Sequence, residues 1–122
     1  MAQNDLGVMY ENGQGVRQDY AQARRWYEQA VAQGDADAQF NLGLMYYNGE
    51  GVPQDYVQAR RWWEKAAAQG SAAAQFNLGV MYYNGEGVRQ DKRAAKEWYG
   101  RACDAGDQKG CDKYRALNEK GF

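Results

Sequence analysis

The sequence predicts an all-α fold, a right-handed α/α solenoid of stacked helical hairpins in a single domain. Three observations support this prediction: a repeat of 36 residues, two helix-forming segments in each repeat, and glycines where the segments end. The composition agrees, because the 122 residues include 15 glycines, one proline and few β-branched residues. A chain of this length can bury one continuous core.

Self-similarity at a fixed spacing is the strongest of these signals. Residues identical in all three repeats are Leu6, Leu42 and Leu78; Gly7, Gly43 and Gly79; Asp19, Asp55 and Asp91; Trp26, Trp62 and Trp98; and Gly34, Gly70 and Gly106. We therefore expect one domain over residues 1–122. It is divided into repeat one (2–34), repeat two (36–70), repeat three (72–106) and a C-terminal capping helix (107–122).

The first segment of each repeat has the periodicity of an amphipathic helix. In repeat two, Ala38, Leu42 and Met45 recur at helical spacing and form one apolar stripe. Asn48 and Gly49 follow, and both tolerate the left-handed conformation that ends a helix. The pattern predicts a first helix that buries this stripe against its neighbours.

The second segment begins with a capping residue and ends at a glycine. Asp55 can accept hydrogen bonds from the exposed amides of the first turn, and Gln58 follows three residues later, as in a capping box. The segment ends at Gly70, and Ser71 is positioned to cap the next first helix. Each repeat is therefore a helical hairpin.

Two glycines in the middle of first helices predict close helix packing. Gly43 and Gly79 each cost about 1 kcal/mol of helix stability relative to alanine. Close approach of the second helix is the compensation we expect, with Trp62 or Trp98 filling the space beside the glycine.

The segment Ala38 to Gly70 has Leu42-Gly43, Gly49, Gly51-Val52, Asp55, Ala59, Trp62 and Ala66 at characteristic spacings. This pattern resembles the SEL-1-like repeat, a relative of the tetratricopeptide repeat with a longer loop. The resemblance covers residues 2–106, and it implies an α/α solenoid that acts as an adaptor in protein assemblies, many of them bacterial. Residues 107–119 resemble a diverged first helix. Arg115 there replaces the packing glycine, so we expect nothing to stack beyond it.

Two cysteines lie on either side of the last inter-repeat turn. The positions equivalent to Cys103 and Cys111 in the earlier repeats face each other, which favours a disulfide that pins the capping helix. Two unrelated free thiols are the alternative. The local sequence also resembles the cysteine-rich secreted bacterial branch of the family, which implies such a bridge. A disulfide in turn predicts a periplasmic or secreted protein. The residues after Met1 show no signal-peptide pattern, so the signal would lie outside this sequence.

A groove along the first helices is the candidate binding site, because first helices line the concave side of tetratricopeptide-like stacks. The residues that a helical wheel places opposite the apolar stripe are Phe40, Asn41, Leu44, Tyr47 and Asn48 in repeat two, Phe76, Asn77, Val80, Tyr83 and Asn84 in repeat three, and Asn4, Asp5, Val8, Glu11 and Asn12 in repeat one. Amide side chains can hydrogen-bond a peptide group in both directions, and aromatic rings bury apolar anchors. The groove therefore suits an extended or helical peptide.

Some of these residues have purely structural alternatives. Asn41 and Asn77 could instead satisfy backbone groups inside the stack, and Phe40 and Phe76 could pack between neighbouring first helices. Tyr47, like its counterpart in repeat three, is expected to be exposed.

Composition disfavours several function classes. The net charge of −1 argues against nucleic acid or an anionic membrane surface, and no stretch is long and apolar enough for membrane insertion. The chain has no histidine, and two thiols are too few for a structural zinc site. Ser71 is the only serine, and position 74 is alanine rather than the lysine that β-lactam chemistry needs. We expect no catalytic residue, metal or cofactor.

The functional hypothesis is a protein-binding scaffold or adaptor that is not an enzyme. A carbohydrate, peptidoglycan or β-lactam-binding envelope protein is the alternative. Sugar binding is disfavoured because we expect the tryptophans to be internal. The flush repeat surface at the N-terminus also permits end-to-end self-association.

Overall fold

The computed structural model describes residues 2–122, which form seven α-helices and no strand. The helices are α1 (Gln3–Asn12), α2 (Tyr20–Ala32), α3 (Ala36–Asn48), α4 (Tyr56–Ala68), α5 (Ala72–Asn84), α6 (Lys92–Asp104) and α7 (Gln108–Glu119). They form the predicted solenoid. None of these helices is long and apolar enough to cross a membrane.

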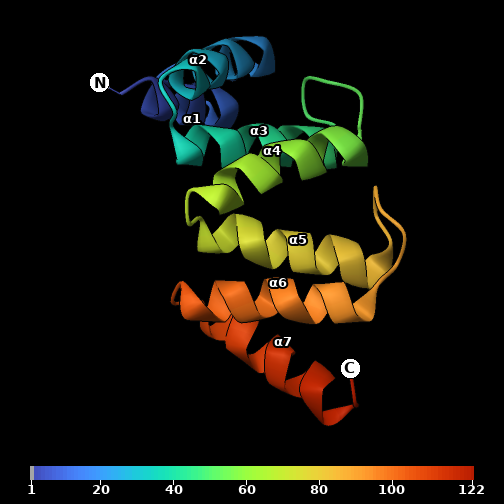
Figure 1. Cartoon of the computed structure of the whole chain (residues 1–122). Helices are drawn as coiled ribbons and strands as arrows, with labels where there is room; N and C mark the ends of the chain where they lie inside the picture. The colour runs from blue at the N-terminus through green and yellow to red at the C-terminus, as the bar shows by residue number, and fades with distance from the viewer. Residues whose placement is uncertain (1) are drawn as a thin grey trace.

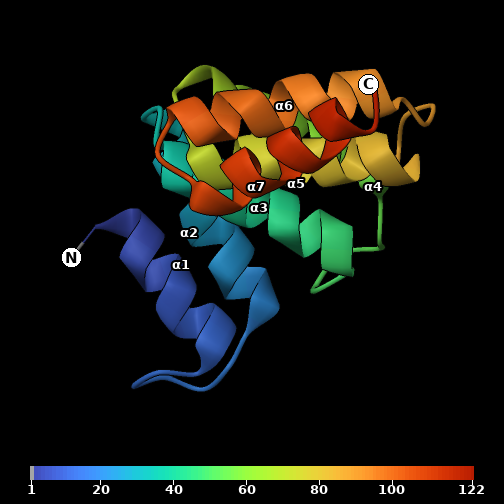
Figure 2. The same ribbon diagram turned by 90° about the horizontal axis from the view of Figure 1, so that it is seen from below.

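The helices stack in chain order. In Figure 1 the chain descends from α1 and α2 to α7, and each helix packs mainly on the helices that precede and follow it. Figure 2, seen from below, shows the α1–α2 hairpin turned relative to the α5–α6 hairpin, as expected for a superhelix. The hairpins α1–α2, α3–α4 and α5–α6 pair the two segments that the sequence places in each repeat.

The predicted aspartate and serine caps are present, but the capping box at Asp55 is incomplete, because the Asp55 amide donates to the Tyr46 carbonyl oxygen at 2.9 Å and not to the Gln58 side chain. The side chains of Asp19, Asp55 and Asp91 accept hydrogen bonds of 3.1, 3.1 and 3.0 Å from amides of the first turns of α2, α4 and α6. Ser71 Oγ accepts from the Ala74 amide at 3.2 Å, so it caps α5. Gly49 ends α3 with φ of 69°, in the left-handed region that glycine adopts without strain. The long loop after each first helix therefore starts from a fixed point.

A buried ring packs on each mid-helix glycine, but it is not the ring that the sequence predicted. A Cβ added to Gly43 would overlap the indole of Trp63, and one added to Gly79 would lie 2.6 Å from the ring of Tyr99. The prediction that Trp62 or Trp98 fills this space is therefore wrong by one residue.

The same one-residue shift decides which tryptophan is internal. Trp63 is 1% exposed, whereas Trp26, Trp62 and Trp98 are half-buried. The ammonium of Lys65 lies 4.7 Å from the centre of the Trp62 ring, so a basic side chain covers that ring. The expectation that all the tryptophans are internal is thus wrong for three of them.

The last helix is fixed to the stack by packing and by a covalent bond. Gly110 lies so close to α6 that a Cβ there would meet the Tyr99 carbonyl oxygen at 2.7 Å. Leu117 is 4% exposed against the same part of the stack. Cys103 and Cys111 form the predicted disulfide, with their Cα atoms 4.6 Å apart. The start of α7 is therefore held against the end of α6 by the disulfide and by the close contact at Gly110.

Candidate functional site

The predicted groove residues of repeats two and three meet in a pocket between α3, α4 and α5. We call it the middle pocket. It has a volume of about 180 Å³ and is lined by Leu44, Tyr47, Asn48, Trp63, Asn77 and Val80. Five of these six residues are on the predicted list. Trp63, from the second helix α4, was not, and it supplies an aromatic wall.

The phenylalanines of the predicted groove pack on the buried rings. The Phe40 ring stacks on Trp63 with centroids 6.2 Å apart, and the Trp63 indole N–H donates to the Phe40 carbonyl oxygen at 3.1 Å. Phe76 packs on Tyr99 with centroids 5.3 Å apart. Both phenylalanines therefore pack on rings of the second helices α4 and α6, a structural role other than the packing between first helices considered from the sequence.

The two groove asparagines differ in their partners. Asn41 Nδ2 donates to Asn4 Oδ1 at 3.0 Å, so this amide links α3 to α1. The Asn77 side chain lines the middle pocket and makes no hydrogen bond within residues 2–122. Asn84 is exposed at the end of α5 and does not line the middle pocket. The other amide of the middle pocket, Asn48, donates to Glu50 Oε1 at 3.2 Å, so Asn77 is the middle-pocket amide without a hydrogen bond in the described chain.

Tyr47 is half-buried rather than exposed. Its hydroxyl donates to both carboxylate oxygens of Glu86, each at 2.9 Å, and its ring lies 5.3 Å from that of Trp63. Burial, together with this hydrogen bond, raises the pKa of Tyr47 to about 12. The Tyr47 ring is thus a fixed wall that ties the middle pocket to the loop after α5.

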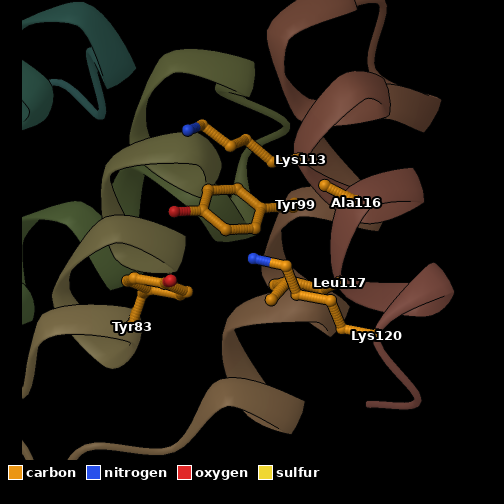
Figure 3. A pocket seen from close by; sticks show the side chains of 6 residues that line it. All are labelled: Tyr83, Tyr99, Lys113, Ala116, Leu117 and Lys120. Carbon is orange, nitrogen blue, oxygen red and sulfur yellow. The ribbon is translucent and has the colours of Figure 1, made fainter.

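A second pocket lies one repeat further along the stack, between α5, α6 and α7. We call it the cap pocket; it has a volume of about 140 Å³ and is lined by Tyr83, Tyr99, Lys113, Ala116, Leu117 and Lys120. Tyr83, Tyr99, Lys113 and Ala116 occupy the positions that Tyr47, Trp63, Asn77 and Val80 occupy in the middle pocket. Figure 3 shows the side-chain nitrogens of Lys113 and Lys120 on the same side as the Tyr99 hydroxyl.

The tyrosine at the cap pocket has no partner for its hydroxyl. Tyr99 is 3% exposed, and its hydroxyl makes no hydrogen bond within the described part of the chain. Burial, with a smaller contribution from Tyr83, raises the pKa of Tyr99 to about 12. The hydroxyl is therefore a neutral hydrogen-bond donor over the physiological pH range.

The first repeat fills the equivalent position with its own carboxylate. Tyr27 aligns with Tyr99, and its hydroxyl donates to Glu11 Oε1 at 2.7 Å. Burial of the Glu11 carboxylate raises its pKa, the hydrogen bond from Tyr27 lowers it, and the nearby Glu50 raises it further. The net direction is upward.

Sequence reasoning missed Trp63, Tyr99, Lys113 and Lys120. The aromatic rings at 63 and 99 lie four residues after Ala59 and Ala95, a spacing that places both on one helix face. This spacing identifies the rings at 63 and 99 as inward-facing. The repeat instead favoured Trp62 and Trp98, one residue earlier, because a tryptophan occurs at that position in all three repeats. Lys113 lies in the diverged helix α7 and Lys120 is the residue at its C-terminal cap, in a segment that the repeat pattern identifies only as a capping helix.

Among residues 2–122, no group of three or more Cys, Asp or Glu side chains is arranged so that it could hold a metal ion. The recurrent aspartates are engaged as helix caps.

The comparisons with solved structures agree with this architecture. The protective antigen c5321 of uropathogenic Escherichia coli, described as displaying an SLR fold, is 40% identical with a TM-score of 0.92 over 98% of this chain. A Sel1 repeat protein from Oxalobacter formigenes is 37% identical with the same TM-score and coverage. This chain spans 26% and 49% of the lengths of those two proteins.

A more distant likeness supports the fold alone. Cysteine-rich protein B of Helicobacter pylori is 20% identical with a TM-score of 0.75, over 92% of this chain and 96% of that one. No curated protein shows significant similarity.

The family comparison covers nearly the whole chain. The Sel1 repeat model matches three times, at residues 1–35, 36–71 and 72–107. The chain therefore belongs to the Sel1 repeat family, whose members generally act as protein–protein interaction modules.

Proposed function

We propose that this chain binds a peptide segment of a partner protein in the groove along α1, α3, α5 and α7, with the middle pocket as the principal anchor site. Binding works through shape and hydrogen bonding on a rigid surface, and it involves no catalytic step. Glycine-packed hairpins and tight caps supply the rigidity, which lowers the entropy cost of binding.

The observation that carries this proposal is the composition of the middle pocket. Leu44, Val80 and Trp63 offer apolar walls, and Asn77 offers an amide with no partner inside the described chain. An apolar side chain of a peptide can occupy such a pocket while the amide bonds the peptide backbone. Interface anchors have this combination of a buried apolar group and a nearby polar contact.

The compartment we propose is periplasmic or extracellular. The Cys103–Cys111 disulfide is of a kind that persists in oxidising environments and is rare in the cytosol. Thiol labelling of protein taken directly from cells tests this: both cysteines should be unreactive before reduction, and two labelled thiols would contradict export.

The test of function is selection of short peptides from a random display library on the immobilised protein. Selected peptides are then titrated by fluorescence anisotropy against the wild-type protein, the variant Asn77→Lys and the control variant Val57→Lys. Asn77→Lys places a long charged side chain at the middle pocket, at a helix position where α7 itself carries a lysine. We expect it to weaken binding at least ten-fold, because it removes the free amide and blocks the apolar walls.

A matched control adds the same charge elsewhere. Val57 lies on α4, is 39% exposed and does not line either pocket, so Val57→Lys should leave affinity unchanged. Thermal melting of both variants checks that they fold. Equal binding to wild-type and Asn77→Lys would contradict the groove proposal. A response of tryptophan fluorescence to peptidoglycan fragments, with no peptide selected, would favour a sugar-binding function instead.

A further inference from the structure

We propose that the cap pocket holds the side-chain carboxylate of an acidic residue in the bound peptide, whereas the middle pocket holds an uncharged side chain. This inference rests on the proposed peptide groove. It specifies one residue of the ligand and the end of the groove at which that residue sits.

Two recurring positions of the groove change to lysine in the last repeat unit, one within α7 and one at its C-terminal cap. One position is occupied in successive first helices by Asp5, Asn41, Asn77 and Lys113; the other is occupied by Asn12, Asn48, Asn84 and Lys120. The groove is therefore lined by amides in the middle and by cations at its last helix. A ligand that crosses both pockets meets two different chemistries, and the cationic one favours an anion.

The two lysines of the cap pocket form no ion pair within the described chain. Within residues 2–122, no carboxylate lies within 4.0 Å of the ammonium of Lys113 or Lys120. A third cation, Lys92, lies 5.3 Å from the centre of the Tyr83 ring. The carboxylate of Glu86, in the loop after α5, already accepts a hydrogen bond from the Tyr47 hydroxyl at the middle pocket.

One residue that lines the cap pocket, Tyr99, has a hydroxyl without a partner in the described chain. The Tyr99 hydroxyl is neutral, has no partner in the described chain and lies on the same side as the two lysine nitrogens in Figure 3. Leu117 and the tyrosine rings provide apolar contact for the methylene groups of an acidic side chain. A carboxylate there accepts from one hydroxyl and pairs with two ammonium groups.

Repeat one contains an internal example of this arrangement. Glu11 occupies in α1 the position that Tyr83 occupies in α5, and its carboxylate accepts from Tyr27, the counterpart of Tyr99, at 2.7 Å. The same backbone framework therefore already brings a carboxylate to this hydroxyl once. At the cap pocket the chain supplies the donor and the cations, and the peptide supplies the carboxylate.

The experiment uses the full chain and random short peptides displayed with their C-termini fused to the carrier, so that only side chains provide carboxylates. We expect the selected peptides to share an acidic residue at one fixed position beside an apolar one. A synthetic, C-terminally amidated peptide in which this residue is changed from Glu to Gln should bind about ten-fold or more weakly, and the difference should shrink at high salt.

The decisive comparison is between two double variants of α7. In Lys113→Gln/Lys120→Gln the Glu and Gln peptides should bind equally, whereas Lys109→Gln/Arg115→Gln removes the same charge outside the cap pocket and should retain the discrimination. Tyr99→Phe should reduce the discrimination without abolishing binding. Circular dichroism melting checks that α7 is folded in each variant.

The outcomes separate this inference from the proposed function. Peptides that bind the middle pocket but lack a fixed acidic residue would overturn the carboxylate assignment and leave the peptide groove intact. Discrimination that survives in Lys113→Gln/Lys120→Gln would overturn it as well. If no peptide is enriched on the wild-type protein, the peptide groove and the carboxylate site both fail.

Discussion

The first and last hairpins use one framework in opposite ways. In both, a tyrosine of the second helix packs on a glycine of the first: Tyr27 on Gly7, and Tyr99 on Gly79. The Tyr27 hydroxyl donates to Glu11, whereas the Tyr99 hydroxyl has no partner in the described chain and its side chain lines a pocket together with Lys113 and Lys120. Repetition therefore fixes where the ring lies, and one non-repeated residue, Glu11, decides whether its hydroxyl has a partner within the chain.

The largest effect we expect comes from the covalent bond found at only one of these ends. Replacing both Cys103 and Cys111 by alanine removes a link between residues eight apart in sequence, worth about 2.5 kcal/mol on the chain-entropy estimate. Amide hydrogen exchange should accelerate in α7 and leave α1 unchanged. Equal acceleration at both ends would mean that the stack unfolds only as a whole, and it would break the comparison.

The next effect tests whether the framework is the same at both ends. Gly7→Ala and Gly79→Ala should each destabilise the protein by about 2 kcal/mol, because the new methyl group overlaps a fixed ring and outweighs the gain in helix propensity. Gly100→Ala is the control. Its Cβ would lie 3.1 Å from the ring of Tyr114, which is 41% exposed and can move. Denaturant unfolding should show Gly100→Ala to be neutral or stabilising. A loss there comparable to those at Gly7 and Gly79 would contradict this account.

The third effect separates the two hydroxyls. Tyr27→Phe should cost about 1 to 1.5 kcal/mol, because it leaves the half-buried Glu11 carboxylate without its donor. Tyr99→Phe should change stability by less than about 0.5 kcal/mol, since no intramolecular bond is lost. Both are measured by denaturant unfolding. Equal costs would indicate that Tyr99 has an intramolecular partner after all.

The repeat pattern was enough to predict the fold but not the chemistry of each pocket. Helix ends and caps follow from local residue types whose physical preferences are strong, such as Asp55 and Gly49. The disulfide follows from the repeat, which places Cys103 and Cys111 across one inter-repeat turn. Most residues that line the middle pocket were on the predicted groove list, because Leu44, Asn77 and Val80 occupy one face of consecutive first helices.

The errors in the sequence-based assignment arise where helical periodicity does not decide which of two adjacent residues faces inward. Trp62 and Trp63 lie three and four residues after the buried Ala59, and helical spacing permits either to face inward. Both rings were expected to be internal, and repetition favoured Trp62 as the ring beside Gly43. The structure places Trp63 there and leaves Trp62 half-buried, so identity between repeats does not by itself indicate burial. The cap pocket was missed because Lys113 and Lys120 break the repeat.

The smallest effect is the pH dependence that the first hairpin carries alone. The pKa of Glu11 is raised above its ordinary value of 4.5, mainly by burial, so the unfolded chain loses this proton at lower pH than the folded protein does. The contribution of Glu11 to the free energy of unfolding is therefore fully present below pH 4.5, and it is lost as the pH rises through the pKa of Glu11 in the folded protein. The stability difference between wild-type and Glu11→Gln should fall across this window.

Tyr27→Phe sharpens this titration. The hydrogen bond from Tyr27 lowers the Glu11 pKa, so its loss should extend the window to higher pH. Urea unfolding across the acidic range measures both differences. Tyr99→Phe should leave them unchanged, because no carboxylate of the described chain accepts from that hydroxyl. A Tyr99→Phe profile that shifts like that of Tyr27→Phe would show that the chain fills both positions itself, and the cap pocket would then need no carboxylate from a ligand.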